Sequence, residues 1–237
     1  GPTTTKRYLP IVTSRGCPYP CRFCVIPATN SRKWRARDAE SVVSEISFLQ
    51  KKYGVTEFHL EDVDSTIDDK RTKEICQEII NKNLKISWKI VSGTKVESLK
   101  NEDTVKLAAK SGCDYISISP ESGSKRVMKL IKKPFNYIHA VKMISEMNKQ
   151  GIMSQACFVL GFPGENVQDR IMTWKMVLDL SLAGVSEIAV FIISPMPGSD
   201  IFDEFALEKD EILSFSPNWR GDYEELSKFR KTLYLTY

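Results

Sequence analysis

The sequence predicts an α/β fold, a partial (β/α)6 barrel with parallel strands and outer helices. Six short apolar runs with a two-residue alternation recur along the 237 residues, and segments with helical periodicity lie between them. Because strand-helix-strand crossovers are right-handed, this order gives a parallel sheet that is covered by helices. Six units are too few for a complete barrel, so we expect an open one.

The predicted strands occupy residues 9–13, 57–61, 86–91, 115–119, 156–160 and 188–193. Helices are predicted over residues 70–81, 101–110 and 137–149, directly after residue 124, and over 222–237. Two further apolar stripes with helical spacing consist of Val42, Ile46, Leu49 and Tyr53, and of Ile171, Trp174, Val177 and Leu178. Glycines suited to left-handed helix caps precede four of the strands, namely Gly54, Gly112, Gly151 and Gly184.

One main domain is predicted over residues 8–208, between a short segment 1–7 and a helical extension 209–237. Gly1-Pro2 resembles the remnant of an expression tag, so we expect the native protein to begin earlier. The sequence shows no signal segment at its start and no apolar run long enough to span a bilayer. Several cysteines without evident partners indicate a reducing, cytoplasmic environment.

The net charge of +4 is too small to indicate nucleic-acid binding. A local basic run is best interpreted as one solvated helix face, and it consists of Lys125, Arg126, Lys129, Lys132 and Lys133.

Cys17, Cys21 and Cys24 form a Cys-x-x-x-Cys-x-x-Cys motif in the loop after the first predicted strand. A disulfide would leave one thiol over, and structural zinc takes four ligands, usually in paired sets. No partner set is evident among the remaining cysteines and the histidines, which are Cys76, Cys113, Cys157, His59 and His139. A [4Fe–4S] cluster held by three thiolates keeps one iron free for another ligand. The spacing favours such a cluster over a chance match or an incomplete zinc site.

The motif resembles the signature of the radical S-adenosylmethionine (SAM) superfamily, in which the residue before the last cysteine is typically aromatic, as Phe23 is. Other segments resemble the same superfamily in chain order, at the ends of successive strands: Glu61-Asp62, Glu121-Ser122-Gly123, Gly161-Phe162-Pro163-Gly164-Glu165 and Pro195-Met196-Pro197-Gly198-Ser199. The combination looks most like the cobalamin-dependent (class B) branch. It implies a partial TIM-like barrel over residues 8–205.

The resemblance implies that the three cysteines ligate a [4Fe–4S] cluster whose open iron binds SAM. Acidic residues would hold the ammonium group and the ribose of SAM, and an aromatic ring would shield the adenine. The implied cofactor contacts are Phe23, Glu61, Asp62, Ser92, Glu121, Phe158 and Gly161. Asp64 and Lys95 are candidates for the substrate or for the SAM carboxylate. Helix capping would explain Asp64 equally well, and a solvent-facing position would explain Lys95.

The implied reaction is reductive cleavage of SAM to a 5′-deoxyadenosyl radical, which abstracts hydrogen from a small-molecule or peptide substrate. An electron donor such as flavodoxin or ferredoxin would supply the electron. The class B branch implies methylation from cobalamin bound by an additional domain that this chain lacks. Cobalamin-free cyclisation, rearrangement or methylthiolation are alternatives. An alternative of another class is a metal-binding regulatory module without turnover.

Overall fold

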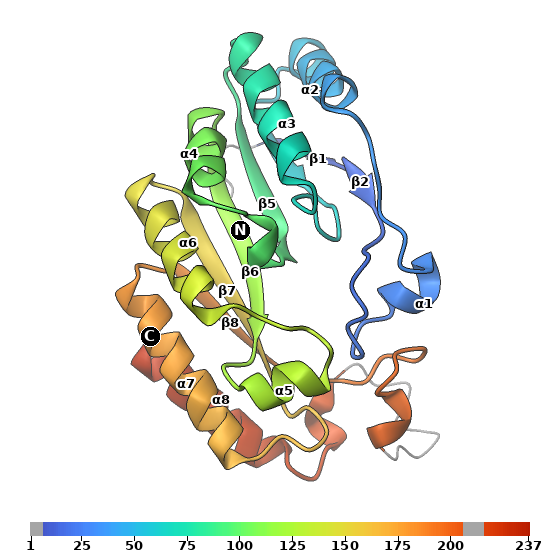
Figure 1. Cartoon of the computed structure of the whole chain (residues 1–237), viewed down its shortest axis with the longest axis vertical. Helices are drawn as coiled ribbons and strands as arrows, with labels where there is room; N and C mark the ends of the chain where they lie inside the picture. The colour runs from blue at the N-terminus through green and yellow to red at the C-terminus, as the bar shows by residue number, and fades with distance from the viewer. Residues whose placement is uncertain (1–6, 206–215) are drawn as a thin grey trace.

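The computed structural model describes residues 7–205 and 216–237. Its centre is a sheet of six parallel strands, hydrogen-bonded in the order in which they occur in the chain (Figure 1). The strands are β1 (Tyr8–Ile11), β4 (Glu57–Leu60), β5 (Ser87–Thr94), β6 (Cys113–Glu121), β7 (Met153–Leu160) and β8 (Glu187–Ile192). The predicted α/β fold with parallel strands is therefore confirmed.

Helices connect successive strands and lie side by side along one face of the sheet (Figure 1). They are α2 (Ala39–Tyr53), α3 (Asp69–Asn81), α4 (Glu102–Lys110), α6 (Tyr137–Lys149) and α7 (Val167–Leu182). An Asp or Asn side chain caps the first turn of each, namely Asp38, Asp68, Asn101, Asn136 and Asn166. The glycines predicted to precede strands all have positive φ.

Shorter elements lie around the carboxyl ends of the strands. The predicted helix after residue 124 is α5 (Lys125–Leu130), and α1 (Ile26–Asn30) follows the cysteine motif. Sequence periodicity missed the antiparallel pair β2 (Ser14–Arg15) and β3 (Arg35–Ala36) because two-residue strands carry no pattern. Single 3-10 turns occur at Val96–Ser98, Phe202–Phe205 and Pro217–Trp219.

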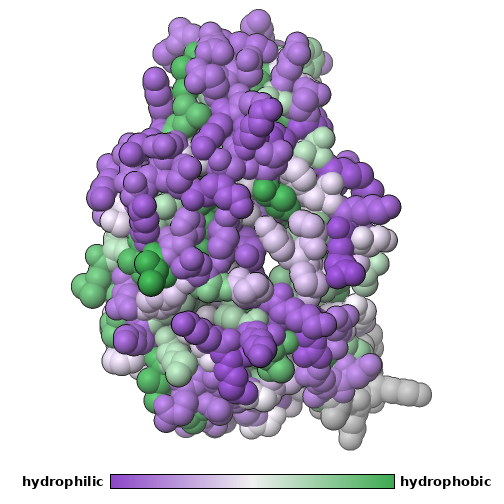
Figure 2. Space-filling view, in the orientation of Figure 1, coloured by the Kyte–Doolittle hydropathy of each residue, from purple (hydrophilic) through white to green (hydrophobic). Residues whose placement is uncertain are grey.

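The main hydrophobic core fills the space between the sheet and the helices. Strand β7 shows how the pleat builds it, since Ala156, Phe158 and Leu160 are fully buried while the alternate residues Gln155 and Cys157 are half-buried. The side chains of the opposite parity face away from this core and leave a more polar sheet face. Hydrophilic residues with scattered apolar patches cover the outside of the helices (Figure 2).

The C-terminal helix α8 (Tyr223–Thr236) packs on β8 and α7. Its residues Leu226 and Leu233 are fully buried in the main core, so the helix belongs to the same packed unit as the sheet. The predicted boundary between residues 208 and 209 lies outside the described residues, as does all but the last residue of segment 1–7. None of the described helices is long and apolar enough to cross a membrane.

Candidate functional site

The cysteine loop, residues 16–25, leaves β2 and leads into α1 at the carboxyl edge of the sheet. Gly16 has a φ of +81°, and a Cβ there would lie 2.1 Å from the carbonyl oxygen of Lys33, so only glycine fits. Cys17, Cys21 and Cys24 are half-buried free thiols. The sequence therefore brings the three predicted ligands together on one short, sterically restricted loop.

The middle of the cysteine loop is docked on the end of α5. The amide of Arg22 donates to the carbonyl of Ile131 (3.0 Å), and its guanidinium donates to the carbonyl of Leu130 (3.3 Å). Arg22 also forms an ion pair with Glu204. Phe23 packs edge-on against Phe162, with ring centroids 5.5 Å apart. These contacts join the loop to segments that follow β6 and β7.

Burial raises the pKa of two thiols in this loop, Cys17 and Cys21, and neighbouring groups partly oppose the effect. The Ile26 amide donates to Sγ of Cys24 (3.4 Å). Burial raises the pKa of Cys21 to about 11, although the cationic Lys133 opposes this effect. Burial also raises the pKa of Cys17, and a backbone hydrogen bond from Tyr19 partly offsets it. Without a bound metal these two thiols are protonated at neutral pH, and a metal cation would favour the thiolates.

Glu121 ends β6 in a conformation that is rare for a residue with a side chain. Its φ is +61°, at a register shift between β6 and β7. The carboxylate is buried and accepts a hydrogen bond from Nζ of Lys133 at 2.5 Å. Backbone strain of this kind is concentrated at functional sites.

Lys133 corrects one interpretation of the sequence. The prediction of a solvated helix face is wrong for Lys133, because its side chain is only 8% exposed and pairs with Glu121. Helix α5 ends at Leu130, and the residue before Pro134 is biased away from helical geometry, so the helical face does not extend to Lys133. Burial alone would lower the pKa of Lys133, but the Glu121 carboxylate reverses this and raises it. The ammonium group also lies 6.0 Å from the ring centroid of Phe23.

Asp62 is buried where β4 ends, and it anchors the chain that enters the cysteine loop. Its carboxylate accepts hydrogen bonds from the amide and hydroxyl of Thr13 (3.1 and 2.9 Å) and from the hydroxyl of Ser14 (2.5 Å). The neighbouring Glu61 is exposed. The structure therefore separates the two predicted SAM contacts, and the side chain of Asp62 is engaged within the protein.

Asp64 organises the loops after β4 and β5. One carboxylate oxygen accepts from Thr66 and from the hydroxyl of Thr94 (2.5 Å). The other accepts from the amide of Lys95 and the hydroxyl of Ser98, both at 3.3 Å. These contacts do not cap α3, whose N-cap is Asp68, so the capping alternative does not explain Asp64.

Lys95 and Ser92 lie at the end of β5, on the same edge of the sheet as the cysteine loop, and both are half-buried. The Lys95 ammonium lies 3.2 Å from Glu97 and 5.0 Å from the ring centroid of Tyr19, a residue of the cysteine loop. Lys95 is thus held beside the loop and does not extend freely into solvent.

At the end of β7, the predicted cofactor contacts Phe158 and Gly161 could offer only backbone groups to a ligand. Phe158 is fully buried in the main core, so a contact with SAM would come from its backbone. Gly161 has a φ of +83°, and its amide donates to Glu165 at 2.5 Å. A Cβ on Gly161 would lie 2.8 Å from the Arg220 guanidinium, so the close approach at this glycine is to the C-terminal segment.

Within the described residues, no group of three His, Cys, Asp or Glu side chains is arranged to hold a metal ion. The cysteines of a [4Fe–4S] cluster bind separate iron atoms, and thiols are the donors that iron–sulfur clusters use. The donor chemistry of the cysteine loop therefore fits a [4Fe–4S] cluster.

Residues 11–177 match the family model of the Radical SAM superfamily, and this match decides the family of the chain. The chain belongs to this superfamily. Its six parallel strands and surrounding helices form the partial barrel of a radical SAM core.

Curated relatives at 30% identity with this radical SAM core include a methyltransferase and a cyclase. The uncharacterized methyltransferase PH0819 of Pyrococcus horikoshii matches over 211 residues, which are 89% of this chain and 44% of the relative. The anaerobic magnesium-protoporphyrin IX monomethyl ester cyclase of Rubrivivax gelatinosus matches over 203 residues, 85% of this chain and 35% of the relative. The chain thus spans less than half the length of these two relatives.

A solved structure shows the same fold. The radical SAM methyltransferase TsrM from Kitasatospora setae, with cobalamin and a [4Fe–4S] cluster bound, superposes with a TM-score of 0.73 at 17% identity. The match covers 88% of this chain and 38% of TsrM. At this identity the similarity supports the partial-barrel fold.

Proposed function

We propose that this chain is the catalytic core of a radical SAM enzyme in which Cys17, Cys21 and Cys24 hold a [4Fe–4S] cluster. When bound, the cluster supplies the electron for cleavage of SAM to a 5′-deoxyadenosyl radical, which abstracts hydrogen from the substrate. The carrying observation is the position of the three thiols on one restricted loop at the carboxyl edge of the sheet. Cobalamin-dependent methylation in the full-length protein is part of the proposal, supported by the methyltransferase relatives.

The surrounding residues act by holding this loop and the adjoining charges in place. Asp62 fixes the entry to the loop, and Arg22 fixes its middle against α5. Phe23 contacts Phe162 edge-on and lies beside the Lys133 ammonium, which holds the aromatic ring of the loop in place. The buried Glu121 carboxylate and Lys133 ammonium provide paired charges for the polar ends of SAM. We propose Glu61, Ser92, Asp64 and Lys95 as further polar groups of this edge.

Anaerobic reconstitution with iron and sulfide, followed by reduction and incubation with SAM, tests the proposal. We expect about four irons and four sulfides per chain, an electron paramagnetic resonance signal on reduction, and formation of 5′-deoxyadenosine. Cys21→Ala should abolish all three. Cys76→Ala, which changes a buried cysteine on α3, is the matched control and should retain them. One zinc per chain without sulfide, or no binding of SAM, would contradict the proposal.

Cyclisation is the second candidate, because a cyclase is among the relatives with 30% identity. SAM labelled in its methyl group separates the two candidates in the full-length protein. Transfer of the label to product together with cobalamin binding supports methylation. We also propose a reducing cytoplasm as the location, since all six cysteines are free thiols.

A further inference from the structure

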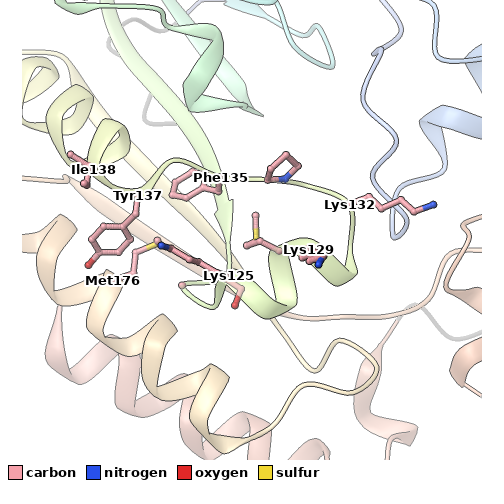
Figure 3. Close-up of a pocket in the computed structure, with 11 residues that line it drawn as sticks. Lys125, Lys129, Lys132, Phe135, Tyr137, Ile138 and Met176 are labelled. Carbon is pink, nitrogen blue, oxygen red and sulfur yellow. The ribbon is translucent and has the colours of Figure 1, made fainter.

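A cavity of about 610 Å³ lies outside the barrel, between α5, the segment 132–135, the start of α6 and α7. Its apolar walls include Met128, Phe135, Ile138 and Met176 (Figure 3). Ile138 is 80% exposed and leaves an apolar surface at the edge of the cavity. We call this cavity and the exposed side of α5 the α5 face.

The α5 face continues into two adjoining hollows along α6. One is lined by Lys95 and Glu97 and the other by Asp179 and Leu182, and both share Tyr137 and Ile138 with the first cavity. Leu182 is 87% exposed. The result is an extended surface, larger than a single small ligand would need.

Three lysines without ion-pair partners among the described residues border the first cavity. Lys125, Lys129 and Lys132 are exposed and line the cavity, and in the part of the chain that the structure describes they form no ion pair. Arg126 on the same helix differs, because it pairs with Asp169. An apolar hollow with unpaired cations on its rim is complementary to an acidic partner that carries an exposed apolar group.

The position of the α5 face relative to the cysteines indicates the kind of acidic partner. The carbonyls of Leu130 and Ile131, at the end of α5, accept hydrogen bonds from Arg22, between Cys21 and Cys24. In Figure 3 the Lys132 side chain extends toward the N-terminal segment that carries these cysteines. A protein bound on the α5 face would therefore sit beside the cysteine loop.

We infer that the α5 face is the docking surface for an acidic protein that carries single electrons. This inference rests on the proposed function, which requires one external electron for each SAM cleavage. The carrier is oxidised by one electron and the cluster is reduced from its 2+ to its 1+ state, with no bond formed or broken and no proton transferred. Charge complementarity selects the carrier, and proximity to the cysteine loop provides the route for the electron.

The test compares two reductants on the reconstituted protein in a stopped-flow spectrometer. An acidic flavodoxin in its hydroquinone state must dock, whereas dithionite needs no protein interface. Lys129→Glu combined with Lys132→Glu should slow reduction by flavodoxin about tenfold or more, with no change toward dithionite. The control variant combines Lys51→Glu with Lys110→Glu, at exposed positions on α2 and α4, and changes the net charge by the same amount. Flavodoxin should reduce this control at the wild-type rate.

Salt and binding measurements complete the test. Reduction of the wild type by flavodoxin should slow as ionic strength rises, and the α5 variant should lose most of this dependence. Equal flavodoxin rates in wild type and variant would overturn the inference, and so would an equal slowing with both reductants. Calorimetric titration of flavodoxin into cluster-free protein tests docking separately. Absence of a cluster would refute the proposed function, while unchanged binding by the α5 variant would refute the docking surface.

Discussion

Replacement of Lys133 by Met should destabilise the protein far more than loss of an ordinary surface ion pair. Lys133 and Glu121 are each 8% exposed and lie 2.5 Å apart, so methionine would leave a buried carboxylate without its cation. Breaking a buried pair from one side costs about 3–5 kcal/mol, whereas an exposed pair contributes about 0–1 kcal/mol. Methionine keeps most of the apolar stem, so the loss would report the charge rather than the packing.

Urea denaturation of the cluster-free chain, followed by circular dichroism, measures this free energy of unfolding. Glu121→Gln combined with Lys133→Met removes both charges and should recover most of the loss. Lys106→Met is the control, because its pairing with Asp103 is 3.8 Å long and exposed. A loss below about 1 kcal/mol in Lys133→Met, or a double variant as unstable as the single one, would refute this reasoning.

Three further predictions concern the same edge of the sheet. Asp64→Asn replaces one carboxylate oxygen by an NH2 group, so the backbone N–H of either Thr66 or Lys95 loses its acceptor. The free energy of unfolding should fall by about 2–3 kcal/mol in urea denaturation, and a loss smaller than about 1 kcal/mol would contradict this. Gly93→Ala should cost about 1–3 kcal/mol, because its Cβ would lie 1.8 Å from Oγ of Ser119, and adding Ser119→Ala should recover part of the loss. Burial raises the pKa of Glu165 from 4.5 to about 7, against a backbone hydrogen bond that favours its charged form. Between these values the folded protein retains a proton that the unfolded chain has released. The free energy of unfolding should therefore fall by about 3 kcal/mol as the pH rises through this window. Glu165→Gln should abolish this pH dependence. A variant whose free energy of unfolding varies with pH as in the wild type would contradict the assignment to Glu165.

The fold could be predicted from the sequence because its signals are local and repeated. Each βα unit carries its own apolar alternation and helical stripe, and left-handed glycines precede four of the six strands. Small errors in strand ends therefore do not alter the order of elements. The apolar alternation of β7 also indicates that Phe158 is buried. It shares its parity in β7 with Ala156 and Leu160, which face the helices.

The site could be predicted only in part, because position at a strand end does not fix where a side chain points. Asp62 and Glu121 both lie at strand ends, yet one carboxylate turns to Thr13 and Ser14 and the other to Lys133. The contact between Glu121 and Lys133 depends on an irregularity in the strand and joins residues that are twelve positions apart in the sequence. Neither feature produces a periodic pattern in the sequence. The Cys-x-x-x-Cys-x-x-Cys spacing, by contrast, is a local pattern.

The contacts around the cysteine loop explain how a short irregular segment can present three thiols reproducibly. Its entry is fixed by hydrogen bonds to Asp62, its first turn by the close contact between Gly16 and Lys33, and its middle by Arg22 on the end of α5. These anchors come from three different parts of the chain, so the loop is positioned by the assembled fold and not by its own sequence. Since the anchors use backbone groups and residues between the cysteines, they leave the three free thiols for ligation. A metal centre that forms on such a loop need not supply the energy to order it.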